Sequence, residues 1–345
     1  MQEIKKRKTT GQITLFDVAK YAGVGTMTVS RALRTPDRVS DKLRQKIQIA
    51  VDTLGYKPNV AASLLASASA NRVVAVITPK IYDHSAQLWL NSLQTHLAKE
   101  EYTTLVIESY HYQNQKFESQ MLDALYSHNL EAILLFQVED ESFIEKILQN
   151  KIVPILNIGK DYEGLTNLNI RIDDSLAMYM LTEYVIKKGY QHIGLLCANQ
   201  EYQIFQQRLH GWHKAMLAYH LPTHRVINAA KPANFSTGSE LLPDMLLNWP
   251  ELDALICTTD ELACGALYEC QRRHIRVPYQ LAVTGFGDNE FSQVSFPALT
   301  TVALPYKEIG EYTATLLLDN LKNKKATNRI DLSAFVPVIR MRASV

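Results

Sequence analysis

The sequence is poor in cysteine and contains no long apolar run. Its 345 residues include only four cysteines, and none stands in a Cys-x-x-Cys pair, which argues against a disulfide framework and against a zinc site. No apolar stretch reaches the roughly 18 residues of a membrane span, and the N-terminus lacks the apolar segment of a signal peptide. We therefore expect a cytoplasmic protein with buried thiols, no metal and no cofactor.

Common catalytic motifs are also missing. The chain contains no Gly-x-Gly-x-x-Gly, no Gly-x-x-x-x-Gly-Lys-Ser/Thr, no Gly-x-Ser-x-Gly and no His-Glu-x-x-His. Ten histidines are scattered without a ligand pattern. A missing motif does not exclude catalysis, so an enzyme is kept as the second hypothesis behind a binding protein.

Charge is distributed unevenly along the chain. Residues 1–72 contain 13 Lys and Arg against 5 Asp and Glu, whereas the remaining residues contain 23 against 30, so the net charge of +1 hides a basic head and an acidic body. A basic segment confined to one end suits contact with the phosphates of a nucleic acid. Each charge in the run of residues 5–8, Lys-Lys-Arg-Lys, is better explained as part of a solvated tail.

Residues 14–31 predict two short helices around a tight turn, the pattern of a helix-turn-helix DNA reader. Thr14 and Asp17 have the spacing of a capping box, and Gly23 suits the left-handed backbone that ends the first helix. Val29 is the expected inward anchor of the second helix. The apolar stripe of the first helix has helical spacing: Leu15, Val18, Ala19 and Ala22.

The outward face of the second helix is predicted to read DNA. An arginine can contact a guanine edge in the major groove, and short or apolar side chains can approach the other bases. An ordinary helical hairpin with a solvated outer face is the alternative. The residues of this face are Thr26, Met27, Thr28, Ser30 and Arg31.

A third helix and a short fourth one follow. Ser40 is the expected cap of the third helix, whose apolar residues repeat to Leu54, and Gly55 ends it. Residues 56–65 read Tyr-Lys-Pro-Asn-Val-Ala-Ala-Ser-Leu-Leu, in which Pro58 suits a helix start. This helix is too short to be stable alone in water, and a plain linker is the alternative.

The helix-turn-helix, the Tyr-x-Pro-Asn join and the short helix ending in leucine resemble the LacI/GalR family of bacterial transcription regulators. In that family the short segment is a hinge helix that folds on the operator and inserts a leucine into the minor groove, and Leu65 matches that leucine. The resemblance implies that further residues contact DNA: Thr14, Arg34, Tyr56, Asn59 and Ala62.

Beyond residue 71, short apolar runs alternate with longer helical patterns such as that of residues 174–188. This alternation predicts doubly wound α/β lobes, in which a ligand binds beyond the carboxyl ends of the strands, in a cleft between the lobes. The runs expected to form buried parallel strands are residues 73–78, 104–108, 132–136, 154–157, 192–197, 254–257 and 281–286.

This part of the chain resembles the family's effector core, which is similar to periplasmic sugar-binding proteins. The resemblance is carried by residues 207–212, 258–266 and 297–302. The expected fold is an all-α helix-turn-helix head (residues 1–57), a hinge helix and linker (58–72), and an α/β periplasmic-binding-protein-like core of two doubly wound lobes (73–345), which binds effector and dimerises. A transport sugar-binding protein is the third hypothesis, disfavoured by the attached head and the missing signal peptide.

The resemblance also implies which residues bind the effector. Arg208 stands where the family places an effector-binding arginine, with a surface ion pair as the alternative. Phe235 matches an aromatic residue against the ligand, and Thr259 a polar residue at a strand end. Lys80 and His84 follow the first strand on the loop expected to face the cleft. Asp260 is expected to cap the following helix.

Two glycines point to an acidic effector. Members that bind neutral sugars commonly carry aspartates where this chain has Gly159 and Gly287. Loss of buried negative charge favours an anion, because an unpaired like charge in a dry pocket costs several kcal/mol. Residues 26–31, 256–263 and 269–272 resemble the gluconate and idonate branch, although Thr26 replaces that branch's lysine, so the operator is expected to differ. A neutral sugar and a nucleobase are the alternative effectors.

Assembly follows from the head. Two helix-turn-helix heads reading one palindromic operator require a two-fold homodimer. The segment 341–345 carries no leucine heptads of the kind that join dimers into tetramers, so a dimer is expected.

Overall fold

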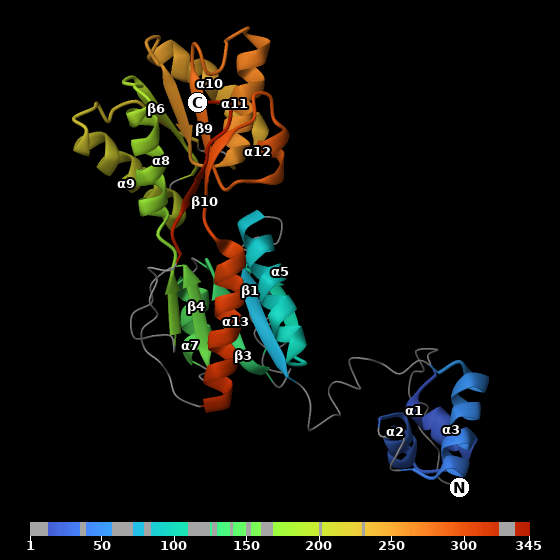
Figure 1. Cartoon of the computed structure of the whole chain (residues 1–345). Coiled ribbons are helices and arrows are strands. Elements are labelled where there is room, and N and C mark those ends of the chain that lie inside the picture. Colours follow the sequence, from blue (N-terminus) through green and yellow to red (C-terminus); the bar gives the residue numbers. More distant parts are fainter. Residues whose placement is uncertain are drawn as a thin grey trace. The chain divides into compact units, whose positions relative to one another are not determined.

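A computed structural model describes most of the chain. The chain divides into two compact units, residues 1–71 and 72–345 (Figure 1). No helix in the described part of the chain is long and apolar enough to cross a membrane. The described residues are 13–34, 39–56, 72–78, 84–109, 125, 130–138, 141–149, 153–159, 168–199, 202–229, 232–323 and 335–345.

The described part of the first unit, called the head, is built from helices α1 (Leu15–Ala22), α2 (Thr26–Arg34) and α3 (Asp41–Leu54). The capping box is confirmed, because the Thr14 and Asp17 side chains each bond the other's backbone. Gly23 and Gly55 end α1 and α3 in left-handed conformations, as predicted. Ser40 is the N-cap residue of α3, as predicted, but its side chain makes no capping hydrogen bond.

The head has its own small core, formed where the three helices meet. Val29 is fully buried in it, which confirms its role as the inward anchor of α2. The other buried members are Val18, Ala19, Ala22, Ala32, Ile47 and Ala50. Burial of these side chains fixes which face of α2 points outward.

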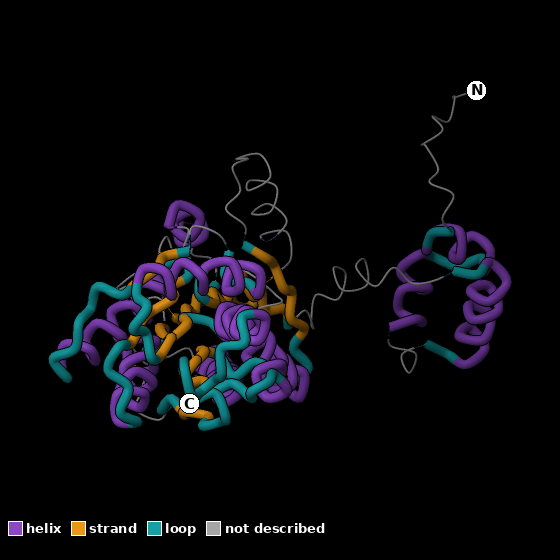
Figure 2. The backbone as a smooth tube through the Cα atoms, turned by 90° about the horizontal axis from the view of Figure 1, so that it is seen from above, coloured by secondary structure: helices purple, strands orange, loops and turns teal. Residues whose placement is uncertain are grey.

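The first lobe of the second unit, called the N-lobe, contains a parallel sheet of five strands. Its order is β2-β1-β3-β4-β5, and α5 (His84–Lys99) and α13 (Tyr306–Asn323) pack against each other on it (Figure 1). Figure 2 shows helices around the strands of the second unit. α7 (Glu141–Gln149) belongs to the same lobe. The strands are β1 (Val73–Thr78), β2 (Thr103–Glu108), β3 (Leu130–Phe136), β4 (Ile155–Gly159) and β5 (Leu168–Arg171).

The second lobe, called the C-lobe, contains a six-stranded sheet of order β11-β10-β9-β8-β6-β7, parallel except for β11. Its strands are β6 (Ile193–Cys197), β7 (Val226–Asn228), β8 (Ala254–Cys257), β9 (Ala282–Phe286), β10 (Thr300–Ala303) and β11 (Val338–Arg340). Its helices are α8 (Asp174–Lys187), α9 (Gln203–Ala218), α10 (Phe235–Asn248), α11 (Asp260–Arg272) and α12 (Glu290–Val294).

The chain passes between the lobes at short connections. β5 leads into α8 through Ile172 and Asp173, and β10 leads into α13 through Leu304 and Pro305. α13 therefore belongs to the N-lobe although its sequence neighbours lie in the C-lobe (Figure 1). All seven predicted runs are strands, and two doubly wound lobes are confirmed, while β5, β7, β10 and β11 were not predicted.

Candidate nucleic-acid interface and ligand site

The outward face of α2 is the candidate nucleic-acid interface. Thr26, Met27 and Arg31 are exposed, and Met27 reaches 75% exposure. Thr28 and Ser30 are half-buried beside the buried anchor Val29. These five predicted reading residues therefore share a surface that the head core leaves open. A face of this kind can enter a major groove with its amino-terminal half against base edges.

The remaining predicted DNA contacts are less well placed. Thr14 is exposed, but its hydroxyl donates to the Asp17 carboxylate at 2.6 Å, and this bond lowers the Asp17 pKa. Tyr56 is half-buried and packs against the head core. Asn59, Ala62 and Leu65 lie outside the described residues, and the side chain of Arg34 is not described either. The predicted hinge helix therefore stays a prediction.

Arg208 lies inside the C-lobe, where its side chain is only 7% exposed. Its Nε donates to Asp174 Oδ1 at 2.8 Å, and its Nη1 donates to the Thr258 carbonyl at 2.6 Å. The guanidinium also lies over the Phe286 ring, 3.7 Å from the centroid. The ion pair is therefore a buried one that ties α9 to α8. Sequence reasoning missed Asp174, which it treated only as the first residue of a helix.

A pocket of about 530 Å³ lies where the two lobes meet. Gly159, at the carboxyl end of β4, lines it on the N-lobe side, and Gln207 lines it from α9. The other lining residues are Arg171, Ile172, Asp173, Ser175, Leu176, Gln203, Leu304, Ile309, Phe335 and Val336. This is the position that the fold class predicts for a ligand.

None of the described residues predicted to bind effector, Arg208 included, is among the residues that line this pocket. Thr259 caps α11, accepting from the Leu262 amide at 3.3 Å, and is 9% exposed. Phe235 begins α10, is 49% exposed and packs edge-on against Phe291, with ring centroids 5.0 Å apart. His84 begins α5 and is half-buried, and Lys80 lies outside the described residues. Their predicted contact with a ligand stays a prediction.

Asp260 is the first residue of α11 and not its cap, so that expectation is wrong, and its carboxylate instead holds the loop that follows β9. Its two carboxylate oxygens accept hydrogen bonds from the Asn289 backbone N–H at 2.7 Å and from the Thr301 hydroxyl at 2.6 Å. Gly287, in this loop, has φ +132°, a conformation that other residues rarely adopt, and Asp288 pairs with Arg342. The backbone alone thus accounts for glycine at 287. Burial raises the pKa of Asp260 to about 7.

The raised pKa predicts that stability depends on pH through Asp260. Folding then takes up a proton between the ordinary pKa of 3.8 and about 7, so this carboxyl lowers the free energy of unfolding as pH rises through that window. We expect the wild type to lose on the order of 2–4 kcal/mol relative to Asp260→Asn between pH 4 and pH 8. Urea unfolding of both proteins at several pH values measures this difference. If the free energies of unfolding of the two proteins change with pH in parallel, the pKa of Asp260 is not raised in the folded protein.

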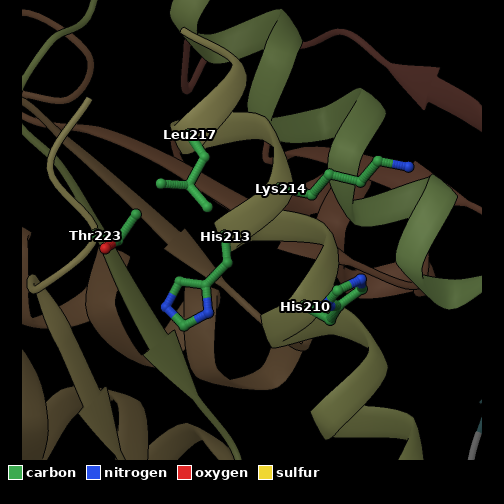
Figure 3. A pocket seen from close by; sticks show the side chains of 5 residues that line it. All are labelled: His210, His213, Lys214, Leu217 and Thr223. Carbon is green, nitrogen blue, oxygen red and sulfur yellow. The ribbon is translucent and has the colours of Figure 1, made fainter. Parts of the chain in front are cut away.

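A second hollow, of about 570 Å³, lies over the outer side of α9. His213, Leu217 and Thr223 lie toward one side of the helix, whereas His210 and Lys214 extend toward the other (Figure 3). The two imidazoles therefore do not converge on one point. Within the described part of the chain, no three His, Cys, Asp or Glu side chains gather as metal ligands. Cys197, Cys257 and Cys270 are buried, as predicted for the thiols, and Cys264 is half-buried.

Comparison with known proteins agrees with this architecture. Residues 14–59 match the model of the lacI family of bacterial regulatory proteins, and residues 182–344 match a periplasmic binding protein-like domain. The chain is also 31% identical to the HTH-type transcriptional regulator GntR of Escherichia coli (strain K12), over 92% of this chain and 94% of that protein. This chain belongs to the LacI family. It is therefore a DNA-binding transcriptional regulator with an effector-binding core, as the motifs predicted.

Two other transcriptional regulators are similarly related. The HTH-type transcriptional regulator IdnR of the same organism is 28% identical over 93% of this chain and 96% of its own length. The solved structure of the transcription regulator GntR from Chromobacterium violaceum is 26% identical, with a TM-score of 0.70, and covers 79% of this chain and 99% of its own. The resemblance to the gluconate and idonate branch thus agrees with two of its similar relatives.

Proposed function

We propose that this LacI-family regulator is a cytoplasmic repressor whose operator binding is controlled by a sugar acid such as gluconate. Its homodimer presents two heads to a palindromic operator, and the effector binds in the interlobe pocket. The protein acts by binding alone and uses no cofactor. A change in lobe arrangement on effector binding can alter DNA affinity only as far as the effector prefers one arrangement.

One observation supports the acidic effector most strongly. The pocket presents Gly159, whose backbone φ of +113° itself favours glycine, where neutral-sugar regulators commonly place an aspartate, so no carboxylate stands at this position. Among the described residues that line the pocket, the acidic one is Asp173. Its carboxylate already accepts a hydrogen bond from the Leu176 backbone N–H at 2.8 Å, as the N-cap of α8. Carboxylates that accept hydroxyl hydrogen bonds from a neutral sugar are thus scarce, and little negative charge opposes an anion. Similarity to GntR and IdnR supports the same class.

A calorimetric panel on the full-length protein tests this proposal. Gluconate is expected to bind, while glucose and hypoxanthine are not, because the neutral sugar lacks the charge and the purine lacks the hydroxyls. Binding of glucose or of the purine, with no heat from gluconate, would replace the acid with one of the two alternative effectors. Thermal unfolding with each compound provides a second readout, since a ligand of the native state raises its stability.

The exposed face of α2 supports a prediction about base reading. Arg31 is expected to contact a guanine, so Arg31→Ala should lower operator affinity by about 1–3 kcal/mol and relax the preference at one base pair. Binding to a series of operator variants measures both effects. Arg44→Ala is the matched control, because this arginine pairs with Asp41 on α3 and is not among the predicted reading residues. Retained discrimination at every base pair would remove Arg31 from the reading face.

A strip of exposed apolar side chains supports a dimer face on the C-lobe. Tyr268 is 60% exposed, and Val294 and Phe296 are each 81% exposed. The loop that carries Phe296 runs along α11, since the Gln271 side chain donates to the Phe296 carbonyl and Ser295 bonds Cys264. Exposed apolar groups gathered in one place commonly mark an interface. We assign this strip, Tyr268, Val294 and Phe296, to the homodimer contact.

A further inference from the structure

We propose that the side-chain amides of Gln203 and Gln207 bind the hydroxyl groups of the effector and so set its specificity. This inference rests on the proposed function, because it names the uncharged contacts that a polyhydroxy acid would make in the interlobe pocket. Both glutamines line that pocket from α9. Sequence reasoning assigned neither of them to the effector, because the resemblance pointed to Arg208 on the same helix.

The two amides lie on one face of α9. Residues four positions apart are neighbours on a helix surface, so Gln203 and Gln207 form one strip that faces the pocket. Ser175 lines the pocket from the first turn of α8, and all three side chains are half-buried. Among the described residues, none of these three side chains has a hydrogen-bond partner. Their polar groups are therefore available to a ligand, which could satisfy them.

Close packing of α9 on α8 fixes where these groups lie. Gly211 is one turn beyond Gln207 on the same face of α9, and a Cβ at Gly211 would overlap the Ser175 carbonyl oxygen. No other residue fits at 211 unless one of the helices moves. The buried pair of Arg208 with Asp174, at 2.8 Å, joins the sequence neighbours of Gln207 and Ser175. The polar groups thus stand on two rigid elements, as a selective site requires.

The rest of the pocket offers few partners for hydroxyl groups. Arg171 and Asp173 line it, but both already take part in contacts within the protein. Phe335 packs edge-on against Tyr312, with ring centroids 5.4 Å apart, and supplies a fixed apolar surface. A ligand that carries hydroxyl groups along a carbon skeleton, such as a sugar acid, therefore suits this lining. The other apolar lining residues are Ile172, Leu176, Leu304, Ile309 and Val336.

A side-chain amide is suited to a hydroxyl group, because each can both donate and accept a hydrogen bond. The amide is also uncharged, so it does not repel a carboxylate elsewhere on the ligand. An analogue that lacks the hydroxyl leaves the amide without a partner in the occupied pocket, which lowers affinity. Gln203 and Gln207 should therefore distinguish the effector from its deoxy analogues.

Calorimetry of the full-length protein with gluconate and its monodeoxy analogues tests this role. The wild type is expected to bind at least one analogue about five- to tenfold more weakly than gluconate, because a hydroxyl contact is lost. Gln203→Met and Gln207→Met keep the side-chain length and helix propensity but remove the amide. At least one of them should weaken gluconate binding about five- to tenfold and bind the discriminated analogue as well as it binds gluconate.

Gln191→Met is the matched control. Gln191 is exposed, does not line the pocket and bonds Asp253 through its backbone N–H, which the change preserves. This variant should bind every compound as the wild type does, and thermal unfolding verifies that each variant is folded. A purely structural defect in a pocket variant would weaken gluconate and its analogues equally, so the loss of discrimination identifies the hydroxyl contact.

Two results would overturn the proposal. If both pocket variants keep the wild-type preference among the analogues, the amides do not bind the hydroxyl groups. If the wild type binds neither gluconate nor glucose, the proposed function and this inference both fail. If it ignores gluconate but binds glucose, the sugar acid alone is wrong, and the same variants with deoxyglucoses decide the role of the amides.

Discussion

Replacing Arg208 with alanine is expected to lower the free energy of unfolding of the core by about 3–5 kcal/mol, because it leaves a buried carboxylate without its cation. Asp174 is that carboxylate, and its side chain is 3% exposed. The change also removes the donor to the Thr258 carbonyl and the group stacked on Phe286. Urea unfolding of the wild type and the variant measures the loss.

The matched control for this variant is Arg272→Ala. Arg272 pairs with Glu269 on α11, but its own side chain is 62% exposed, so its loss should cost less than about 1 kcal/mol. A double variant, Arg208→Met with Asp174→Asn, should recover part of the stability lost in Arg208→Ala, since no unpaired charge then remains. If Arg208→Ala unfolds like the wild type, the pair contributes no more than a surface contact. A lost effector response in this variant is interpretable only once folding is verified.

Replacing Phe296 with glutamate is expected to convert the homodimer to a monomer and to weaken operator binding by more than about 100-fold, because two linked half-site contacts then become separate events. Phe296 belongs to the proposed strip and, like Val294, is 81% exposed. A charge buried at an apolar contact lacks a partner and opposes association. Light scattering with size-exclusion chromatography measures the mass, and operator binding measures the consequence.

Leu217→Glu serves as the control for the dimer variant. Leu217 is also exposed, at 64%, but it lies on α9, which Figure 1 draws on the opposite side of the C-lobe from α12. It should leave both mass and operator affinity unchanged. A Phe296→Glu protein that remains dimeric would assign the dimer contact to another surface.

Local signals in the sequence predicted the head closely. The Thr14 and Asp17 capping box, the glycine turn and the buried Val29 each depend on residues a few positions apart, and the structure has them as expected. Strong apolar runs likewise predicted the central strands. The strands β5, β7, β10 and β11 are three or four residues long and, unlike the equally short β8, each contains polar residues, so no continuous apolar run marks them.

The candidate site could not be predicted in the same way because its contacts are distant in sequence. Arg208 and Asp174 are 34 positions apart, and nothing in their local patterns indicates that α8 and α9 pack together. Arg171 becomes a pocket residue only through its register with Gly159. A resemblance could point to Arg208, but whether that side chain faces ligand or core depends on packing.

The most direct test of the account measures operator binding by the full-length protein with and without gluconate. The operator is first selected by the protein from random palindromic duplexes, and its binding is followed by fluorescence anisotropy. The account predicts that gluconate changes operator affinity by at least about tenfold, within the usual range of such couplings, whereas glucose and hypoxanthine leave it unchanged. An operator affinity that is indifferent to gluconate but responds to glucose or hypoxanthine would contradict it.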